Sequence, residues 1–261
     1  MSGFESRWLD LREPVDRRSR DAGLLDKAAA FAAEAPDPLL VDLGCGTGST
    51  LRAMAPLLPA ARWRLVDNDP ALLAEAESRA GAAAVETLRC DLADLSAAPL
   101  EGARLVTASA LFDLTSRAFV EALADRLASL GAGLYAVLSY DGDVRWSAPH
   151  PLDLAVVAAF NRHQRGDKGF GPALGPDSGA ALAEAFAARG FAVTTASTPW
   201  LLGPEDADLM CAFADGMARA AGEIGTLACD DLEEWRAARL DAAPHSRCTI
   251  GHRDVLALPP R

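Results

Sequence analysis

The segment LLVDLGCGTGS, residues 39–49, constrains the fold of this chain more than any other part of the sequence. It begins with an apolar run that contains one acid, Asp42, and continues with glycines at every second position, Gly44, Gly46 and Gly48. A short apolar run bounded by glycines is typical of a buried strand. In a doubly wound sheet the turn from the first strand into the first helix is the usual cofactor loop. Glycines in that loop allow positive φ angles and a close approach of the backbone to a ligand.

The rest of the sequence alternates short β-like runs with helical stretches, which is typical of βαβ units. The expected strands are Leu39–Leu43, Arg62–Asp67, Ala84–Arg89, Arg104–Ser109, Gly133–Ser139, Ala192–Ala196 and Thr249–Leu256. The expected helices are Pro14–Glu34, Ser49–Leu57, Pro70–Ala80, Ser116–Ser129 and Ser178–Arg189. We therefore expect an α/β fold with a doubly wound, mostly parallel, seven-stranded sheet of the Rossmann-like type.

Two long segments interrupt this alternation, residues 141–176 and residues 198–243. Structureless connections of such length are uncommon in a compact domain, so we expect each segment to form a partly helical cap insertion over the sheet edge. Substrate selectivity commonly lies in such insertions. The predicted organisation is an N-terminal helical segment, residues 1–35, followed by one domain over residues 36–261 that includes both caps.

Composition limits the partners of the chain. Its 37 acidic and 25 basic residues give a net charge of −12, which repels phosphate backbones and argues against nucleic acid as a partner. The five cysteines are scattered and form no C-x-x-C pair, so we expect a reducing, cytoplasmic setting and no metal site. No apolar run approaches the roughly 20 residues of a membrane helix, and the first residues lack the apolar core of a signal peptide. We therefore expect no membrane association.

Two kinds of cofactor loop compete for the glycine segment. A dinucleotide loop follows G-x-G-x-x-G, which requires glycine or a small apolar residue at position 49, where this chain has Ser49. The third glycine is instead Gly48, so the pattern is D-x-G-x-G-x-G. A nicotinamide-dependent oxidoreductase is therefore the disfavoured alternative.

The D-x-G-x-G-x-G pattern resembles the first motif of the class I S-adenosylmethionine-dependent methyltransferases. Including three later motifs, the resemblance covers roughly residues 39–139. It implies that S-adenosylmethionine is the cofactor, that the loop of Gly44, Gly46 and Gly48 wraps its methionine part, and that Asp42 serves its ammonium group.

The three later motifs each follow a predicted strand. In RLVDNDPALL, Asp67 stands where the family's acid accepts both ribose hydroxyls, which suits a carboxylate, and Asn68 lies under the adenine edge. In TLRCDLADL, the resemblance implies that Asp91 accepts from the adenine amino group and that the backbone N–H of Leu92 donates. The segment LVTASALFDL resembles the loop that faces the methyl group and places Ser109 beside the chemistry.

Three residues are candidates for a catalytic role. Methyl transfer requires a nucleophile held in line with the C–S bond, and a neutral oxygen or nitrogen nucleophile also needs a base. His163 lies on the apolar face of an expected helix over residues 152–163, with a satisfied, partly buried histidine as the alternative. Asp113 follows the fourth strand, where it can instead cap the helix near Ser116, and Tyr140 ends the fifth strand.

Candidate substrate-binding residues come from two segments. The segment NRHQRGDKGFG has many donors next to a glycine-rich turn, which predicts a lid with Asn161, Arg165 and Lys168 as substrate contacts. A solvated helix end is the alternative. Near the N-terminus, Trp8 and Arg12 are candidates for contact with an acidic substrate or with the cofactor carboxylate.

The other arginines of the N-terminal segment have a simpler interpretation. Arg17 and Arg20 are expected to be solvated, on a helix with Glu13–Arg17 and Asp16–Arg20 pairs at i,i+4 spacing.

The predicted function is S-adenosylmethionine-dependent methyl transfer to a small-molecule acceptor by in-line displacement. The alternatives are a nicotinamide-dependent oxidoreductase and a non-catalytic S-adenosylmethionine-binding sensor or scaffold module. An N-P-P-Y-type motif is missing where SALFD stands, which argues with the acidic charge against a nucleic-acid base amine as the acceptor. The sequence leaves the acceptor and the oligomeric state open.

Overall fold

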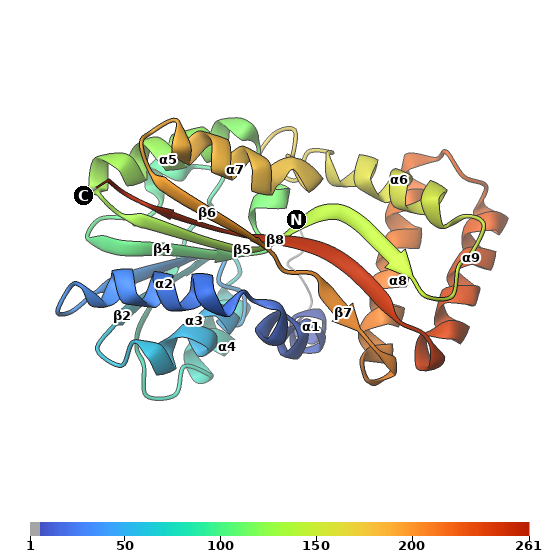
Figure 1. Ribbon diagram of the computed structural model, residues 1–261, viewed down its shortest axis with the longest axis horizontal. Coiled ribbons are helices and arrows are strands. Elements are labelled where there is room, and N and C mark those ends of the chain that lie inside the picture. Colours follow the sequence, from blue (N-terminus) through green and yellow to red (C-terminus); the bar gives the residue numbers. More distant parts are fainter. Residues whose placement is uncertain (1–5, 261) are drawn as a thin grey trace.

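The structure is a computed structural model that describes residues 6–260, with helices on both faces of a central sheet and more helices beyond one end of it (Figure 1). The strands are β1 (Leu39–Leu43), β2 (Arg62–Asp67), β3 (Ala84–Arg89), β4 (Ala103–Ser109), β5 (Gly133–Trp146), β6 (Ala192–Ser197), β7 (Trp200–Leu202) and β8 (Cys248–Leu258). The α-helices are α1 (Ser6–Ser19), α2 (Ala22–Ala33), α3 (Ser49–Met54), α4 (Pro70–Ser78), α5 (Arg117–Leu130), α6 (Asp153–Gln164), α7 (Ser178–Ala187), α8 (Ala207–Ile224) and α9 (Cys229–Ala242). The 3₁₀ turns are η1 (Ala55–Leu57), η2 (Leu95–Ala97), η3 (Phe112–Leu114), η4 (Gly175–Asp177), η5 (Pro204–Asp206) and η6 (Ala243–His245).

The central sheet has the strand order β3-β2-β1-β4-β5-β8-β6, and the short strand β7 pairs with β8. Strands β1 to β5 are parallel, whereas β8 runs antiparallel to β5, β6 and β7. This arrangement confirms the predicted α/β fold with a doubly wound, mostly parallel sheet. The strand order reverses between β1 and β4, so their carboxyl ends form the switch point at which such sheets bind ligands.

The seven predicted strands are all present, and the sheet contains an eighth strand, β7, that the prediction did not include. Only three residues long, β7 carries little sequence signal of its own. It is a strand because Trp200 pairs with Ile250 and Leu202 pairs with Cys248 on the extended β8. Its partner is therefore supplied by the tertiary structure.

The N-terminal segment differs from the single helix predicted over Pro14–Glu34. It forms two helices, α1 and α2, and Pro14 lies in the middle of α1 rather than in a first turn. The break falls at Arg20 and Asp21, because the Asp21 side chain accepts a hydrogen bond from the Leu24 backbone N–H at 2.8 Å and so caps α2.

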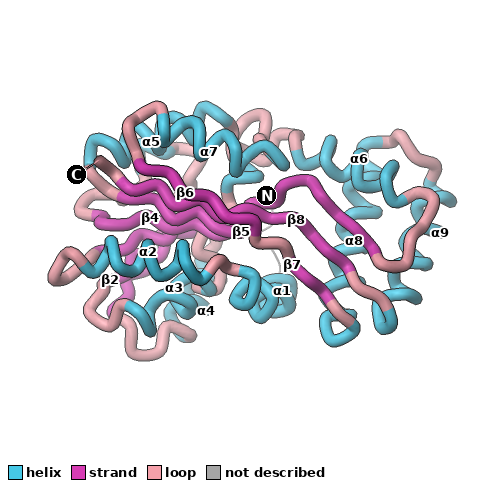
Figure 2. The backbone as a smooth tube through the Cα atoms, in the orientation of Figure 1, coloured by secondary structure: helices cyan, strands magenta, loops and turns pink. Residues whose placement is uncertain are grey.

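The two predicted cap insertions fold against each other as one unit. We call this unit the helical lobe and define it as α6, α8 and α9 with β7 and the ends of β5 and β8 that follow Tyr140 and precede His252. Figure 2 shows β5 and β8 running from the central sheet into the lobe, where the short strand β7 pairs with β8. Helix α6 packs on α8, and α8 packs on α9, so the helices of the two insertions form one unit. The domain boundaries themselves stay a prediction.

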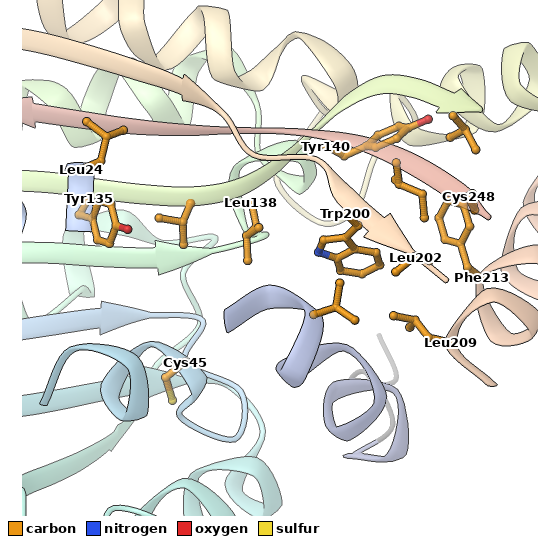
Figure 3. Close-up of a cluster of buried hydrophobic side chains, with 14 of the residues drawn as sticks. Leu24, Cys45, Tyr135, Leu138, Tyr140, Trp200, Leu202, Leu209, Phe213 and Cys248 are labelled. Carbon is orange, nitrogen blue, oxygen red and sulfur yellow. The ribbon is translucent and has the colours of Figure 1, made fainter. Parts of the chain in front are cut away.

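Two apolar cores flank the sheet. One lies between the sheet and α5 and α7. The other lies between the opposite face and α2, α3 and α4, and continues without a break into the lobe. Figure 3 shows this continuity, from Leu24 and Tyr135 at the sheet, through Trp200, to Leu209 and Phe213 on α8. The lobe and the sheet therefore share one apolar core.

The buried carboxylate of Asp254, on β8, joins three separate segments. Its Oδ1 accepts from the Leu138 N–H at 2.8 Å and from the Thr198 hydroxyl at 2.9 Å, and its Oδ2 accepts from the Asp21 N–H at 3.1 Å. Leu138 has a positive φ of 56° within an irregularity of β5, a conformation that a non-glycine residue holds only when its surroundings enforce it. Asp254 therefore fixes where β5 bends toward the lobe and where α2 begins.

We predict that Asp254→Ala lowers the free energy of unfolding by about 3–5 kcal/mol, because three donors lose their acceptor and two of the bonds are buried. Chemical denaturation monitored by circular dichroism measures this loss. Asp26→Ala, which removes an exposed carboxylate from α2, is the matched control and is expected to change stability by less than about 0.5 kcal/mol. Equal stability of the two variants would contradict the role given to Asp254.

Candidate functional site

The glycine loop connects β1 to α3 at the switch point. Gly44, Gly46 and Gly48 have φ angles of +61°, +53° and +84°, so all three occupy the left-handed region that disfavours side chains. A Cβ at Gly46 would lie 3.2 Å from Leu9 of α1, and one at Gly44 would lie 3.2 Å from a Leu111 methyl group. The loop therefore needs glycine both for its conformation and for its close neighbours.

Asp67 ends β2 and holds the glycine loop. Its Oδ2 accepts from the Gly46 N–H at 2.9 Å, and its Oδ1 accepts from the Asp69 N–H at 3.0 Å. Each carboxylate oxygen has two lone pairs, so each can accept one further donor, such as a ribose hydroxyl.

The other predicted adenosine-binding residues lie at the neighbouring strand ends. Asn68 is exposed directly after β2, and Asp91 is exposed after β3 with its Oδ1 accepting from the Ala93 N–H at 3.0 Å. Leu92 is buried. Their roles toward a cofactor stay predictions.

Asp42 lies on β1 beneath the loop and is fully buried. Its Oδ1 accepts from the Thr107 hydroxyl at 2.6 Å, whereas its Oδ2 is buried with no hydrogen-bond partner among the described residues. Burial raises the pKa of Asp42 to about 7 against the opposing effects of Thr107 and Arg20. An uncompensated buried oxygen of this kind suits a site that receives a donor from a ligand.

Arg20 was expected to be solvated and paired with Asp16, and the structure corrects this. Arg20 is only 7% exposed, and its Nη2 points toward the hydroxyls of Thr50, at 3.4 Å, and Ser109, at 3.5 Å. Asp16 pairs instead with Arg12, at 2.8 Å. The i,i+4 spacing on one helix did not reveal the inward direction of Arg20, because the helix ends one residue earlier and the chain turns there. The predicted Arg17–Glu13 pair is present at 3.3 Å.

Helix α1 covers the loop and is joined to α3 by an ion pair. The guanidinium of Arg52 donates to both carboxylate oxygens of Glu13, at 2.7 and 2.6 Å. Two-point pairs of this kind fix orientation as well as distance. Helix α1 therefore packs against the glycine loop and forms one boundary of the space around it.

A second group of side chains lies where α1 meets the lobe, near the middle of β5. The Trp200 indole donates to Asp16 at 2.9 Å, and the Arg12 guanidinium lies 5.3 Å from the centre of the Trp200 ring. Trp8 contributes a second indole, 6.3 Å from Trp200. The structure thus brings the predicted residues Trp8 and Arg12 together with Trp200, which the sequence analysis did not single out.

Asp113 and Tyr140 border the same group. Asp113 is buried with no partner for its Oδ1, and burial raises the pKa of Asp113 to about 6 against the effect of the nearby Arg12. The Tyr140 hydroxyl donates to Asn161 at 2.8 Å, so two further predicted residues meet. Burial raises the pKa of Tyr140, which keeps it a neutral hydrogen-bond donor.

His252 of β8 is a further functional candidate that the sequence analysis missed. Its Nδ1 lies 3.0 Å from the carbonyl oxygen of Ile250, which can only accept, so Nδ1 carries the proton and Nε2 keeps its lone pair. Burial, reinforced by Arg12, lowers the pKa of His252 to about 3. The centre of the ring lies 4.8 Å from that of the Trp200 ring, with the two planes tilted by 40°. Its signal in the sequence was the period-two series Cys248, Ile250, His252, Asp254 and Leu256, in which two polar residues interrupt an apolar row.

The remaining predicted residues lie at the far end of α6. His163 has its Nε2 2.9 Å from the carboxylate of Glu223 on α8, and Lys168 lies 3.3 Å from the His163 Nδ1. Arg165 pairs with Asp177 at 3.1 Å. These contacts tie α6 to α8 and η4, and the predicted catalytic and substrate roles of these residues stay predictions.

Residues 40–131, about a third of the chain, match the protein-family model described as a methyltransferase domain. They run from β1 through α5 and include the whole glycine loop. These residues therefore carry a methyltransferase domain, in agreement with the class I motifs of the sequence. The methyltransferases of this family use S-adenosylmethionine as their cofactor. No curated protein matches the chain by sequence.

Solved structures share the fold of the methyltransferase. The YcgJ protein from Bacillus subtilis is 17% identical, over 92% of this chain and 100% of that chain, with a TM-score of 0.53. The cyclopropane synthase MmaA2 from Mycobacterium tuberculosis is 13% identical, over 97% and 94%, with a TM-score of 0.52. Geranyl diphosphate methyltransferase in complex with S-adenosylmethionine is 12% identical, over 100% and 93%, with a TM-score of 0.50. At these identities the likeness is one of fold.

The residues at the switch point fit this cofactor. An ammonium group can donate to the unpartnered Oδ2 of Asp42, and ribose hydroxyls can donate to Asp67. Within residues 6–260, no three His, Cys, Asp or Glu side chains gather in a way that would hold a metal ion. None of the helices in this range is both long and apolar enough to cross a membrane.

We predict that the affinity of the methyltransferase for S-adenosylhomocysteine rises with pH between pH 6 and pH 8. Asp42 has a pKa of about 7 in the free protein, and a bound ammonium group favours its ionised form, so binding releases a proton. The expected gain is about tenfold over this range. Calorimetry in buffers of different ionisation enthalpy measures both the affinity and the proton. Asp42→Asn should bind more weakly and without this pH dependence; the same pH dependence in that variant would assign it to another group.

Proposed function

We propose that this methyltransferase transfers the methyl group of S-adenosylmethionine to a small molecule held between α1 and the helical lobe. The observation that carries the proposal is a pair of buried proton acceptors near Arg12 of α1. Asp113 has an unpartnered Oδ1, and His252 is a neutral ring with its lone pair on Nε2. Arg12 lies close enough to influence the pKa of both groups.

The chemistry of this acceptor site suits a molecule with an aromatic or apolar body and a polar nucleophile. Trp8, Trp200 and Tyr140 supply ring surfaces, and stacked aromatic surfaces hold planar or apolar ligands well. Asp113 and His252 supply acceptors for a proton on oxygen or nitrogen. The geranyl diphosphate methyltransferase among the similar structures shows that the fold also hosts methylation of a small molecule.

In the proposed mechanism the bound cofactor supplies an electrophilic methyl group on a sulfonium. The glycine loop and Asp67 would hold that group, and the aromatic side chains next to α1 would hold the acceptor with its nucleophile facing the methyl group. Positioning of this kind supplies several kcal/mol of the rate enhancement, up to roughly 10. Asp113, which is ionised above its pKa of about 6, takes the proton from the nucleophile, or His252 takes it through Nε2. Tyr140 positions the acceptor or the lobe through its hydroxyl.

The other partner predictions belong to the same proposal. The net charge of −12 supports a small molecule over nucleic acid as the acceptor. The five cysteines are all unpaired, which supports the proposed cytoplasmic location.

Calorimetry with S-adenosylhomocysteine and with NAD tests the cofactor assignment. The methyltransferase is expected to bind the first and not the second. Incubation with methyl-labelled S-adenosylmethionine and a panel of alcohols, phenols, amines and carboxylates then tests turnover. A nucleic-acid sample and a protein sample serve as comparison acceptors. Label transferred only to nucleic acid or protein would contradict the small-molecule proposal, and binding without transfer to any acceptor would favour a sensor or scaffold.

We predict that Asp67→Ala weakens the binding of S-adenosylhomocysteine by about 1–3 kcal/mol, or roughly 5- to 150-fold. The variant removes the acceptor for two ribose hydroxyls and also releases the Gly46 N–H from its 2.9 Å hydrogen bond. Asp37→Ala, which removes an exposed carboxylate from the opposite end of β1, is the matched control. Calorimetry compares the two variants, and unchanged affinity in Asp67→Ala would place the ribose elsewhere.

A further inference from the structure

We propose that Arg20 binds the carboxylate of the cofactor's methionine part and thereby selects ligands that carry this group. The inference rests on the proposed function, because it concerns how the chain recognises one end of S-adenosylmethionine. It goes beyond that function by assigning a role to a residue that the sequence pattern had placed in solvent.

The first observation is that Arg20 is buried without a counter-ion. It is 7% exposed, and its Nε and Nη1 have no hydrogen-bond partner among the described residues. Its Nη2 reaches the hydroxyls of Thr50, at 3.4 Å, and Ser109, at 3.5 Å, both at the long limit of a hydrogen bond, and the Tyr135 hydroxyl also lies near the guanidinium. No carboxylate within residues 6–260 lies within ion-pair distance of Arg20, and Asp42 and Asp254 interact with it only over a longer range.

This arrangement is costly for the free protein. A guanidinium keeps its charge at any pH a protein survives, so it cannot avoid the cost of burial by losing a proton. Burial of an unpaired charge costs several kcal/mol of folding free energy, and the long hydrogen bonds of this guanidinium recover little of that cost. Proteins keep such groups at functional sites, where a ligand supplies the missing partner. The missing partner of Arg20 is an anion.

The position of Arg20 identifies the anion. Its neighbours Thr50 and Ser109 belong to α3 and to the end of β4, so the guanidinium lies at the switch point, beside the start of the glycine-loop helix. Asp42 of β1 is close enough for Arg20 to lower its pKa, yet its Oδ2 is also unpartnered. The site therefore offers an unsatisfied cation and an unsatisfied anion that do not pair with each other.

A zwitterion satisfies both groups at once. The amino-acid end of S-adenosylmethionine carries an ammonium group for Asp42 and a carboxylate for Arg20. A pyrophosphate, as in a nicotinamide dinucleotide, would pair with Arg20 but leave Asp42 without a donor. The planar fork of a guanidinium also matches the two oxygens of a carboxylate.

The local fold holds Arg20 in this direction. Helix α1 ends at Ser19, and the Arg20 N–H bonds to the Asp16 carbonyl at 3.2 Å. The next residue, Asp21, is fixed at both ends, because its side chain caps α2 and its N–H donates to Asp254 at 3.1 Å. The turn between the two helices is therefore held in place, and the Arg20 guanidinium is pre-positioned.

The test compares two ligands that differ at the methionine end. S-Adenosylhomocysteine carries the ammonium and carboxylate groups, whereas 5′-methylthioadenosine carries the same adenosine and thioether without them. Arg20→Gln is expected to weaken the binding of S-adenosylhomocysteine by about 10- to 100-fold and that of methylthioadenosine by less than about twofold. Arg20→Lys, which keeps the charge but loses the fork, should fall between wild type and Arg20→Gln. Arg17→Gln, on the exposed side of α1, is the matched control and should bind both ligands as wild type does.

Unfolding measurements separate recognition from support of the fold. Because the buried charge is unpaired, Arg20→Met should leave the ligand-free protein at least as stable as wild type while it loses affinity for S-adenosylhomocysteine. If Arg20→Gln lost the same affinity for both ligands, or none for either, the role of Arg20 would be overturned while the proposed function would stand. Failure of the wild-type protein to bind S-adenosylhomocysteine would overturn the proposed function and this role with it.

Discussion

The hydrogen bonds of one buried carboxylate, Asp254, hold together the parts of the chain that form the site. Two of its partners, Leu138 and Asp21, lie more than 100 residues away along the sequence. The bond to Leu138 stabilises a positive φ in β5, after which the strand leaves the central sheet and enters the lobe. The bond to Asp21 fixes the turn after α1, where Arg20 enters the cofactor site. Without this carboxylate the bend of β5 and the turn after α1 would no longer be held to the same residue of β8.

Helix α1 is the second element on which the site depends, because it is a wall shared by both halves. On one side it packs Leu9 against Gly46 and pairs Glu13 with Arg52, next to the cofactor loop. On the other side its Asp16 accepts from Trp200 of the lobe. Helix α1 therefore contacts both the cofactor loop and the residues of the proposed acceptor site.

The cofactor half was predictable because its signals are local. Strand, glycine turn and helix follow one another within residues 39–54, and the conformation of each glycine depends on its nearest neighbours. The acids at 42, 67 and 91 were assigned through the resemblance to the methyltransferase motifs, each of which lies on or directly after a predicted strand. Strand ends in a parallel sheet meet at one edge, so a linear pattern was sufficient to bring these residues together.

The acceptor half was not predictable to the same degree, because its residues face one another only through long-range packing. The sequence analysis named Trp8 and Arg12 as candidates, but their common neighbour Trp200 lies on a strand that exists only through its pairing with β8. His163 had the stronger local pattern, and the structure places it in a cluster with Glu223 and Lys168. His252 had the weaker pattern, and packing against Trp200 and Arg12 determines its charge state.

The sequence by itself determined the α/β class, the order of the strands along the chain, the glycine loop and the acids beside it, since each follows from periodicity and backbone conformation over a few residues. Only the tertiary structure decided which charges are buried. The inward direction of Arg20, the unpartnered oxygen of Asp42 and the neutral ring of His252 arise where segments from opposite ends of the chain exclude water from the same space. Desolvation is a property of that shared space, and no single segment of the sequence carries it.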